Sequence, residues 1–161
     1  MRRLALLALL LPLAACDDHD HDDEHAHEDL TAEACEHGAE GPFQAVTAAA
    51  PVDAPAIQGY SHTRVDITLP AGPDGNGGAV AFNVSEAGDY NFFLTADVPI
   101  AFLVDRAPLP IEDTVAVTEC EAIAVHHTVE LPAGEVFLMF GPTAATEVGV
   151  VFEAADHEHA H

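Results

Sequence analysis

The stretch VHHTVELPAGEVFLMF, residues 125–140, decides the fold. Apolar side chains recur at alternate positions in each half, and a tight Leu-Pro-Ala-Gly turn, residues 131–134, separates the halves. Period-two alternation puts one set of side chains on one face of a strand. The stretch therefore predicts two consecutive β-strands, each with an apolar face toward a core. The apolar positions are Val125, Val129, Leu131, Val136, Leu138 and Phe140.

The same alternation continues outward from these strands, in short runs separated by Gly, Pro or Asp. No helical period survives after Phe43, so residues 31–154 are predicted to form one mainly β domain that begins with a short helix. We expect an antiparallel β-sandwich, jelly-roll-like or immunoglobulin-like, of about eight strands. A barrel is the alternative, because patterning does not distinguish closed from open sheets. The further runs are Val65, Ile67, Leu69; Val80, Phe82, Val84; Tyr90, Phe92, Leu94; Ile100, Phe102, Val104; and Val148, Val150, Phe152.

Two segments repeat the order strand, Ala-Gly, strand: AFNVSEAGDYNFFL, residues 81–94, and TVELPAGEVFLMFGP, residues 128–142. They resemble bacterial pre-peptidase C-terminal-type β-sandwich modules, which use this order for successive hairpins. The resemblance covers roughly half of the chain and implies a fold, without catalytic residues to carry over.

Residues 1–15 have the layout of an export signal, with a basic start, an apolar run and small residues before Cys16. The apolar run is shorter than the ~20 residues that cross a bilayer. The sequence LAAC, residues 13–16, resembles the lipobox of bacterial lipoproteins. The resemblance implies that Cys16 is acylated and becomes the mature N-terminus. We then expect a protein anchored by lipid to the cell membrane, on its periplasmic or extracellular side; the alternative is an ordinary cleaved signal with an incidental cysteine.

The chain is strongly acidic, with 28 Asp and Glu against 4 Lys and Arg, and a formal net charge of −24. Removal of residues 1–15 leaves Arg64 and Arg106 as the only strong bases. Such a surface repels nucleic acid and attracts cations. We therefore expect no nucleic-acid partner.

Histidines alternate with carboxylates in two terminal segments, residues 16–30 and 155–161. These tails lack apolar residues to bury, and we expect them to be disordered without metal. Imidazoles two and four residues apart in a flexible chain can surround one ion, and Zn(II), Ni(II) and Cu(II) accept this ligand set. The alternative is that the tails are solubilising spacers. The tail histidines are His19, His21, His25, His27, His157, His159 and His161.

A short helix is predicted over residues 31–38, with Thr31 as N-cap and Gly38 at the C′ position. With Cys16 acylated, Cys35 and Cys120 remain as an even pair in an oxidising compartment, which predicts a disulfide between them. The alternative is that both cysteines are thiolate metal ligands.

Strand parity places His127 on the apolar face of its strand, where a histidine is either buried and hydrogen-bonded or directed at a site near the sheet edge. A Cys35–Cys120 bond would bring the helix that carries His37 toward this strand. We therefore predict that His37, His127 and His62 converge as an ordered zinc site of three imidazoles.

The sequence contains no Gly-x-Ser-x-Gly elbow, His-Glu-x-x-His helix or phosphate-binding glycine loop, and we expect no enzyme. Two hypotheses follow. The first is a lipid-anchored, extracytoplasmic protein that buffers, scavenges or delivers Zn(II), or Ni(II) or Cu(II). The second is a structural module of the cell envelope, whose sandwich binds a protein or glycan partner while the tails act as spacers.

Overall fold

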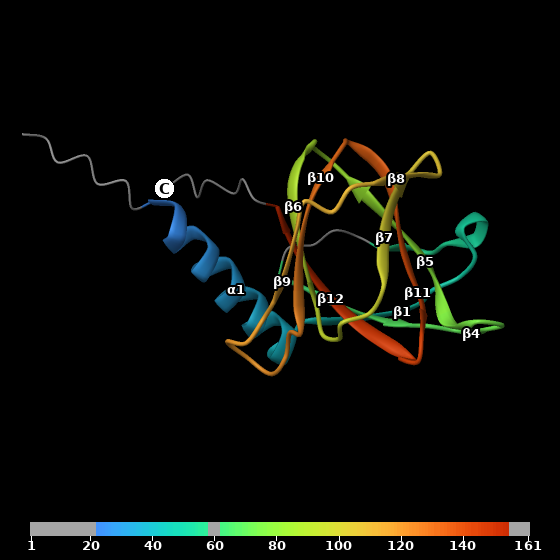
Figure 1. The fold of residues 1–161 in the computed structure, drawn as a ribbon, viewed down its shortest axis with the longest axis horizontal. Coiled ribbons are helices and arrows are strands. Elements are labelled where there is room, and N and C mark those ends of the chain that lie inside the picture. The colour runs from blue at the N-terminus through green and yellow to red at the C-terminus, as the bar shows by residue number, and fades with distance from the viewer. Residues whose placement is uncertain (1–21, 58–61, 155–161) are drawn as a thin grey trace, which may run out of the picture.

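The computed structural model describes residues 22–57 and 62–154 (Figure 1). These ranges hold one α-helix, α1 (Asp22–Glu40), one 3-10 turn, η1 (Pro51–Asp53), and twelve strands. None of the described helices is long and apolar enough to cross a membrane. The strands are β1 (Phe43–Thr47), β2 (Ala56–Ile57), β3 (Arg64–Thr68), β4 (Ala71–Gly72), β5 (Gly75–Val84), β6 (Gly88–Leu94), β7 (Ile100–Val104), β8 (Ala107–Leu109), β9 (Asp113–Ala116), β10 (Val125–Leu131), β11 (Gly134–Thr143) and β12 (Glu147–Ala154).

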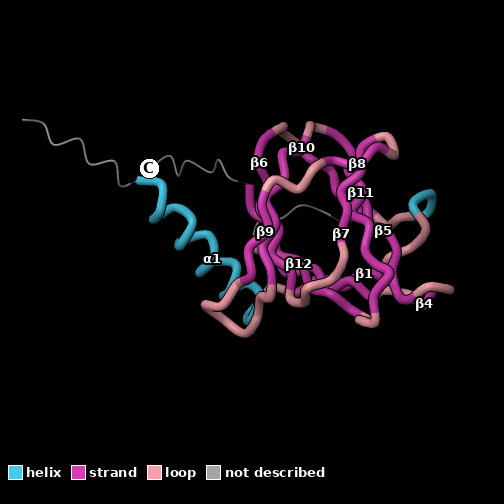
Figure 2. The backbone as a smooth tube through the Cα atoms, viewed as in Figure 1, coloured by secondary structure: helices cyan, strands magenta, loops and turns pink. Residues whose placement is uncertain are grey.

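The strands form two sheets, and α1 lies outside the first of them (Figure 2). The first sheet has the order β1-β3-β12-β6-β10-β9, and the second has the order β2-β5-β11-β7-β8 with β4 paired to β5. An isolated bridge between Ala49 and Ala79 joins the segment after β1 to β5. Residues 125–140 belong to β10 and β11, which lie in different sheets.

The predicted all-β class with one N-terminal helix is confirmed, but two details differ. The sheets are mixed, because β1 pairs with β3 and β2 pairs with β5 in parallel. The strands also outnumber the expected eight. Two of the extra strands, β2 and β4, span two residues each and carry no alternating pattern, so local sequence gives no signal for them.

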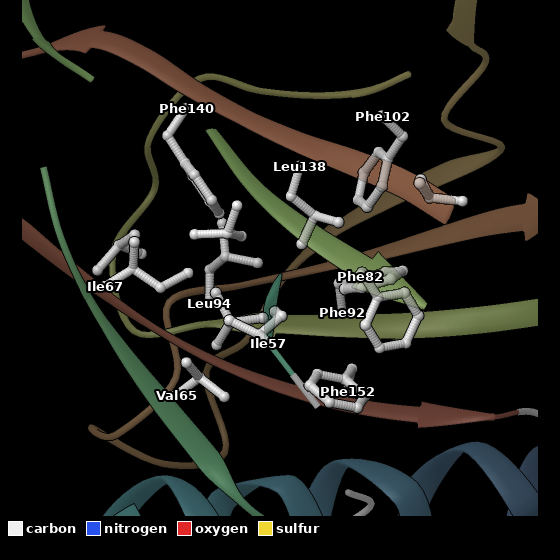
Figure 3. Close-up of a cluster of buried hydrophobic side chains, with 14 of the residues drawn as sticks. Ile57, Val65, Ile67, Phe82, Phe92, Leu94, Phe102, Leu138, Phe140 and Phe152 are labelled. Carbon is white, nitrogen blue, oxygen red and sulfur yellow. The ribbon is translucent and has the colours of Figure 1, made fainter. Parts of the chain in front are cut away.

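The main core lies between the sheets and consists mostly of the residues that alternation predicted (Figure 3). Ala48, Ile57 and Val98 are also buried in it, whereas the predicted Ile100 and Val104 are only partly buried. Phe82 of the second sheet meets Phe152 of the first edge-on, with ring centroids 4.8 Å apart. Phe92 and Phe102 make a similar contact across the core at 4.7 Å. Burial of a large apolar side chain contributes about 1.5–3 kcal/mol, so this layer is the main source of stability.

A second, smaller cluster joins α1 to the outer face of the first sheet. Its buried members are Ala34, Phe93, Ile123 and Val151. Phe93 and Val151 point away from the main core, because they alternate with the inward residues of β6 and β12. The predicted disulfide between Cys35 and Cys120 is confirmed and fastens the helix beside this cluster, with Cα atoms 6.0 Å apart.

The helix is longer than predicted, since α1 includes residues 22–30 of the segment expected to be disordered and continues past Gly38. Residues 22–30 contain neither Gly nor Pro, and their Glu and Ala residues favour helix. The helix ends at Gly41, whose φ of 78° is left-handed and whose N–H donates to the His37 carbonyl at 3.1 Å. Gly41 thus occupies the C′ position expected for Gly38.

Candidate metal site

A glutamate and a histidine of α1 lie close to a histidine from the loop before β3. Glu33 and His37 are four residues apart, so they share one face of the helix. His62 stands two residues before the start of β3, with a left-handed φ of 66°. In sequence it is in phase with Arg64 and Asp66, which lie on the outer face of β3, whereas Val65 and Ile67 face the core. One ligand atom from each of Glu33, His37 and His62 lies within 4.8 Å of the others.

The donor atoms of this cluster are spaced as ligands of a single ion would be. His62 Nδ1 lies 2.8 Å from Glu33 Oε1 and 3.1 Å from His37 Nε2. His37 Nε2 and Glu33 Oε1 are 4.0 Å apart. In a tetrahedral site with bonds of about 2.1 Å, the donors are about 3.4 Å from one another. Small side-chain movements would therefore bring all three donors to bonding distance of one ion.

The orientation of His37 is set by the end of its own helix. Its Nδ1–H donates to the carbonyl of Gly41 at 3.1 Å, and a carbonyl can only accept. Nε2 therefore keeps its lone pair, directed toward His62. Metal-bound histidines commonly make this second hydrogen bond to a backbone carbonyl, because it fixes the tautomer and the ring.

Arg64 fastens the end of α1 to β3 next to the cluster. Its Nε donates to Asp66 Oδ1 at 2.8 Å, its guanidinium donates to the carbonyl of Gly38, and it lies 4.5 Å over the ring of Phe43. The charge of Arg64 is balanced by Asp66. The helix and the loop that supply the three donors are thus held together independently of the cluster itself.

A second carboxylate lies beneath the cluster. Glu153 of β12 shares the outer face with Val151, and its side chain is 2% exposed. Its Oε1 accepts a hydrogen bond from the His62 backbone N–H at 3.1 Å and lies 3.7 Å from His62 Nδ1. Burial raises the pKa of Glu153, and the hydrogen bond and the charge of His62 oppose this shift.

His127 does not join His37 and His62, so the predicted convergence of three histidines is wrong. Its side chain is 6% exposed on the inner face of β10, and its Nδ1 lies 2.9 Å from the Thr114 hydroxyl. Burial lowers the pKa of His127, with a smaller opposing effect of Asp97. The disulfide does bring α1 to this region, but onto the outer face, and strands β12 and β6 separate β3 from β10.

The remaining predicted residues cannot be placed in a site. Cys16, His19 and His21 lie outside the described residues, as do His157, His159 and His161. His25 and His27 lie within α1, but only their backbone is described.

Sequence reasoning missed the two carboxylates. Glu33 carried a usable signal, because Glu and His four residues apart on a predicted helix share a face. Glu153 carried none, because its burial depends on a helix that is distant in sequence. No protein-family model matches the sequence, and no curated protein matches it.

Proposed function

We propose that the protein binds a divalent transition-metal cation, with Zn(II) as the best fit, at Glu33, His37 and His62. The observation that carries the proposal is the spacing of three donor atoms from two separate chain segments, all within 4.8 Å. In this proposal Glu33 replaces His127 as the third ligand of the ordered site.

The donor types favour borderline cations. Two imidazole nitrogens and one carboxylate oxygen suit Zn(II), and also Ni(II) or Cu(II). Calcium and magnesium prefer sets made entirely of oxygen ligands. The net charge of −24 raises the local concentration of cations around the protein.

The cellular setting is part of the same proposal. The lipobox-like residues 13–16 support an acyl anchor at Cys16, and a disulfide supports an oxidising compartment outside the cytoplasm. The two sheets would be a jelly-roll-like or immunoglobulin-like scaffold of the pre-peptidase C-terminal type, without catalysis. The histidines of both tails would add weaker, flexible binding capacity. The role would be buffering, scavenging or delivery of the ion.

One feature favours the second hypothesis, a protein partner in the envelope. Strand β9 forms an edge of the first sheet, and all four of its residues are exposed. An exposed edge presents backbone donors and acceptors to which a partner strand can add.

Calorimetric titration of Zn(II) into the acyl-free mature protein tests the metal proposal. We expect one sub-micromolar equivalent above weaker tail binding. His62→Ala and Glu33→Gln should abolish this equivalent, whereas replacing the tail histidines by asparagine should preserve it. Glu36→Gln is the matched control, because it removes the same charge from an exposed position of the same helix. Binding only in the submillimolar range, or tight binding that disappears with the tail histidines, would contradict the proposal.

A further inference from the structure

We propose that Glu153 is the fourth ligand of this site, so that the protein holds its cation in a closed, charge-neutral set of two imidazoles and two carboxylates. This inference rests on the proposed function and adds to it the coordination and the charge class of the ion. The set of three described above would leave a position open, whereas a set of four encloses the ion.

Glu153 lies next to one of the three proposed ligands. Its Oε1 is 3.7 Å from His62 Nδ1, and the separations among the donors of Glu33, His37 and His62 run from 2.8 to 4.0 Å. These values lie on both sides of the ~3.4 Å expected between donors of a tetrahedral zinc site. The hydrogen bond from the His62 N–H holds this carboxylate oxygen beside the imidazole. Glu153 approaches from the sheet, while Glu33 and His37 approach from the helix. The donors that all lie within 4.8 Å of one another are Glu33, His37 and His62, so the proposed set of four requires the Glu153 carboxylate and the helix ligands to move toward one another when the ion binds.

Burial makes the charge of the Glu153 carboxylate energetically costly. Glu153 is 2% exposed on a face where its strand neighbour Val151 packs in an apolar cluster. A buried carboxylate without a cation costs several kcal/mol. Among the described residues, the strong bases are Arg64, which pairs with Asp66, and Arg106, which lies in the β7–β8 turn of the other sheet. The described groups that face Glu153 from α1 and the β3 loop are Glu33, His37 and His62. Of these groups, His62 is the nearest that can carry a positive charge, and it does so only when protonated. A divalent cation would supply the countercharge while His62 stays a neutral ligand.

A set with two carboxylates should also select divalent over monovalent cations. Two carboxylates neutralise a divalent cation, but with a monovalent cation the half-buried site would keep a net negative charge. Charge imbalance is more costly at low dielectric than in water. The site should therefore prefer Zn(II) or Co(II) to a soft monovalent ion such as Ag(I), beyond the preference that the imidazoles alone would give. A closed set of four protein ligands is also typical of sites that retain zinc, whereas catalytic sites keep a position open.

Glu153→Gln in the mature full-length protein tests the inference. Glutamine keeps the acceptor for the His62 N–H and the side-chain volume, but removes the charge. We expect Zn(II) affinity to fall at least ~10-fold, the lower end of the loss seen for outer partners of metal ligands. The visible d–d absorption of bound Co(II), which is intense in four-coordinate sites, should weaken, and the preference for Zn(II) over Ag(I) should shrink. The metal-free variant should unfold at the same or a higher temperature, because a buried charge is lost.

Two further variants make the result decisive. Glu147→Gln removes a carboxylate from an exposed position of the same strand and should change none of these quantities. Glu153→Asp keeps the charge one methylene further from the ion, so it should restore the preference for divalent ions while the Co(II) spectrum stays altered. Unchanged affinity and spectrum in both Glu153 variants would overturn the inference, and the proposed function would stand if His62→Ala still abolished binding. Absence of a tight equivalent in the unmodified protein would overturn both.

Discussion

Replacing His127 by leucine should remove part of the loss of stability that the protein suffers on acidification. His127 is buried between the sheets, and no described group pairs with its Nε2. Burial depresses the pKa of the folded imidazole below its ordinary value of 6.5. Below that pH the unfolded chain binds a proton that the folded protein does not. The free energy of unfolding must therefore decrease as the pH falls from 6.5 toward the folded pKa, and the decrease ends below it.

The size of the effect follows from one proton. A single group contributes at most about 1.4 kcal/mol of stability change per pH unit within that window. Leucine has a similar volume, cannot bind a proton, and removes a buried nitrogen that has no hydrogen bond. At neutral pH we expect the variant to be as stable as the original protein or more stable by about 1 kcal/mol, because an unpaired buried polar atom costs about 1–3 kcal/mol. Thr114 loses its partner, but it is exposed and can bond to water.

Urea unfolding of the metal-free protein at several values between about pH 7.5 and pH 5.5 measures this difference. The difference between the two proteins isolates His127 from the other histidines, which titrate in both. Thr114→Val is the control: it removes the hydrogen bond to Nδ1 but keeps the buried imidazole, so it should retain the acid-dependent slope. Parallel curves for the original protein and the His127→Leu variant would refute the reasoning.

Two further predictions concern the disulfide and the core. Replacing Cys35 and Cys120 together by serine should lower stability by roughly 4 kcal/mol in the chain-entropy model. It should also weaken Zn(II) binding, because Cys35 lies on α1 between two proposed ligands. Equal Zn(II) affinity in titrations of both proteins would show that helix docking does not depend on the bridge. Phe92→Ala should cost about 3–5 kcal/mol in urea unfolding. Phe43→Ala should cost under about 1 kcal/mol, because Phe43 is half exposed and loses mainly its contact with Arg64, and similar losses for the two would contradict the assigned core.

Alternation was enough to predict which faces of the strands are buried, because side-chain direction is a local property of extended backbone. Val65, Phe92 and Val150 are buried between the sheets as their positions in the pattern indicated. Parity also placed His127 on the correct face of its strand; of the two alternatives left open, the buried and hydrogen-bonded one is the one observed. The pairing of strands was beyond this reasoning, since β1 and β3 meet in parallel across a long connection that leaves no local pattern.

The candidate site could be predicted only to the extent that its residues are related along one element. His37 was placed on a helix that the disulfide fastens to the domain, and this part is confirmed. The prediction was wrong about which face of the sheet the helix covers. The disulfide was expected to bring the helix toward His127, although the parity of β10 already placed His127 on the inner face. Glu153 lies beside the candidate site because α1 covers the outer face of β12, and no local sequence pattern predicts that contact.

The proposed metal site lies between α1 and the first sheet, so metal binding there would be linked to helix docking. The helix is held there by a small apolar cluster, the disulfide and the hydrogen bond from Arg64 to the Gly38 carbonyl. If the proposed site binds an ion through both elements, the ion would stabilise the docked helix by about 2.7 kcal/mol when free metal is at 100 times the Kd. Linkage is reciprocal, so whatever draws α1 away from the sheet must weaken metal binding by the same factor. Under the proposed function, the docked helix and the bound ion would form one thermodynamic unit, and a partner that acts on α1 would control release of the ion without touching its ligands.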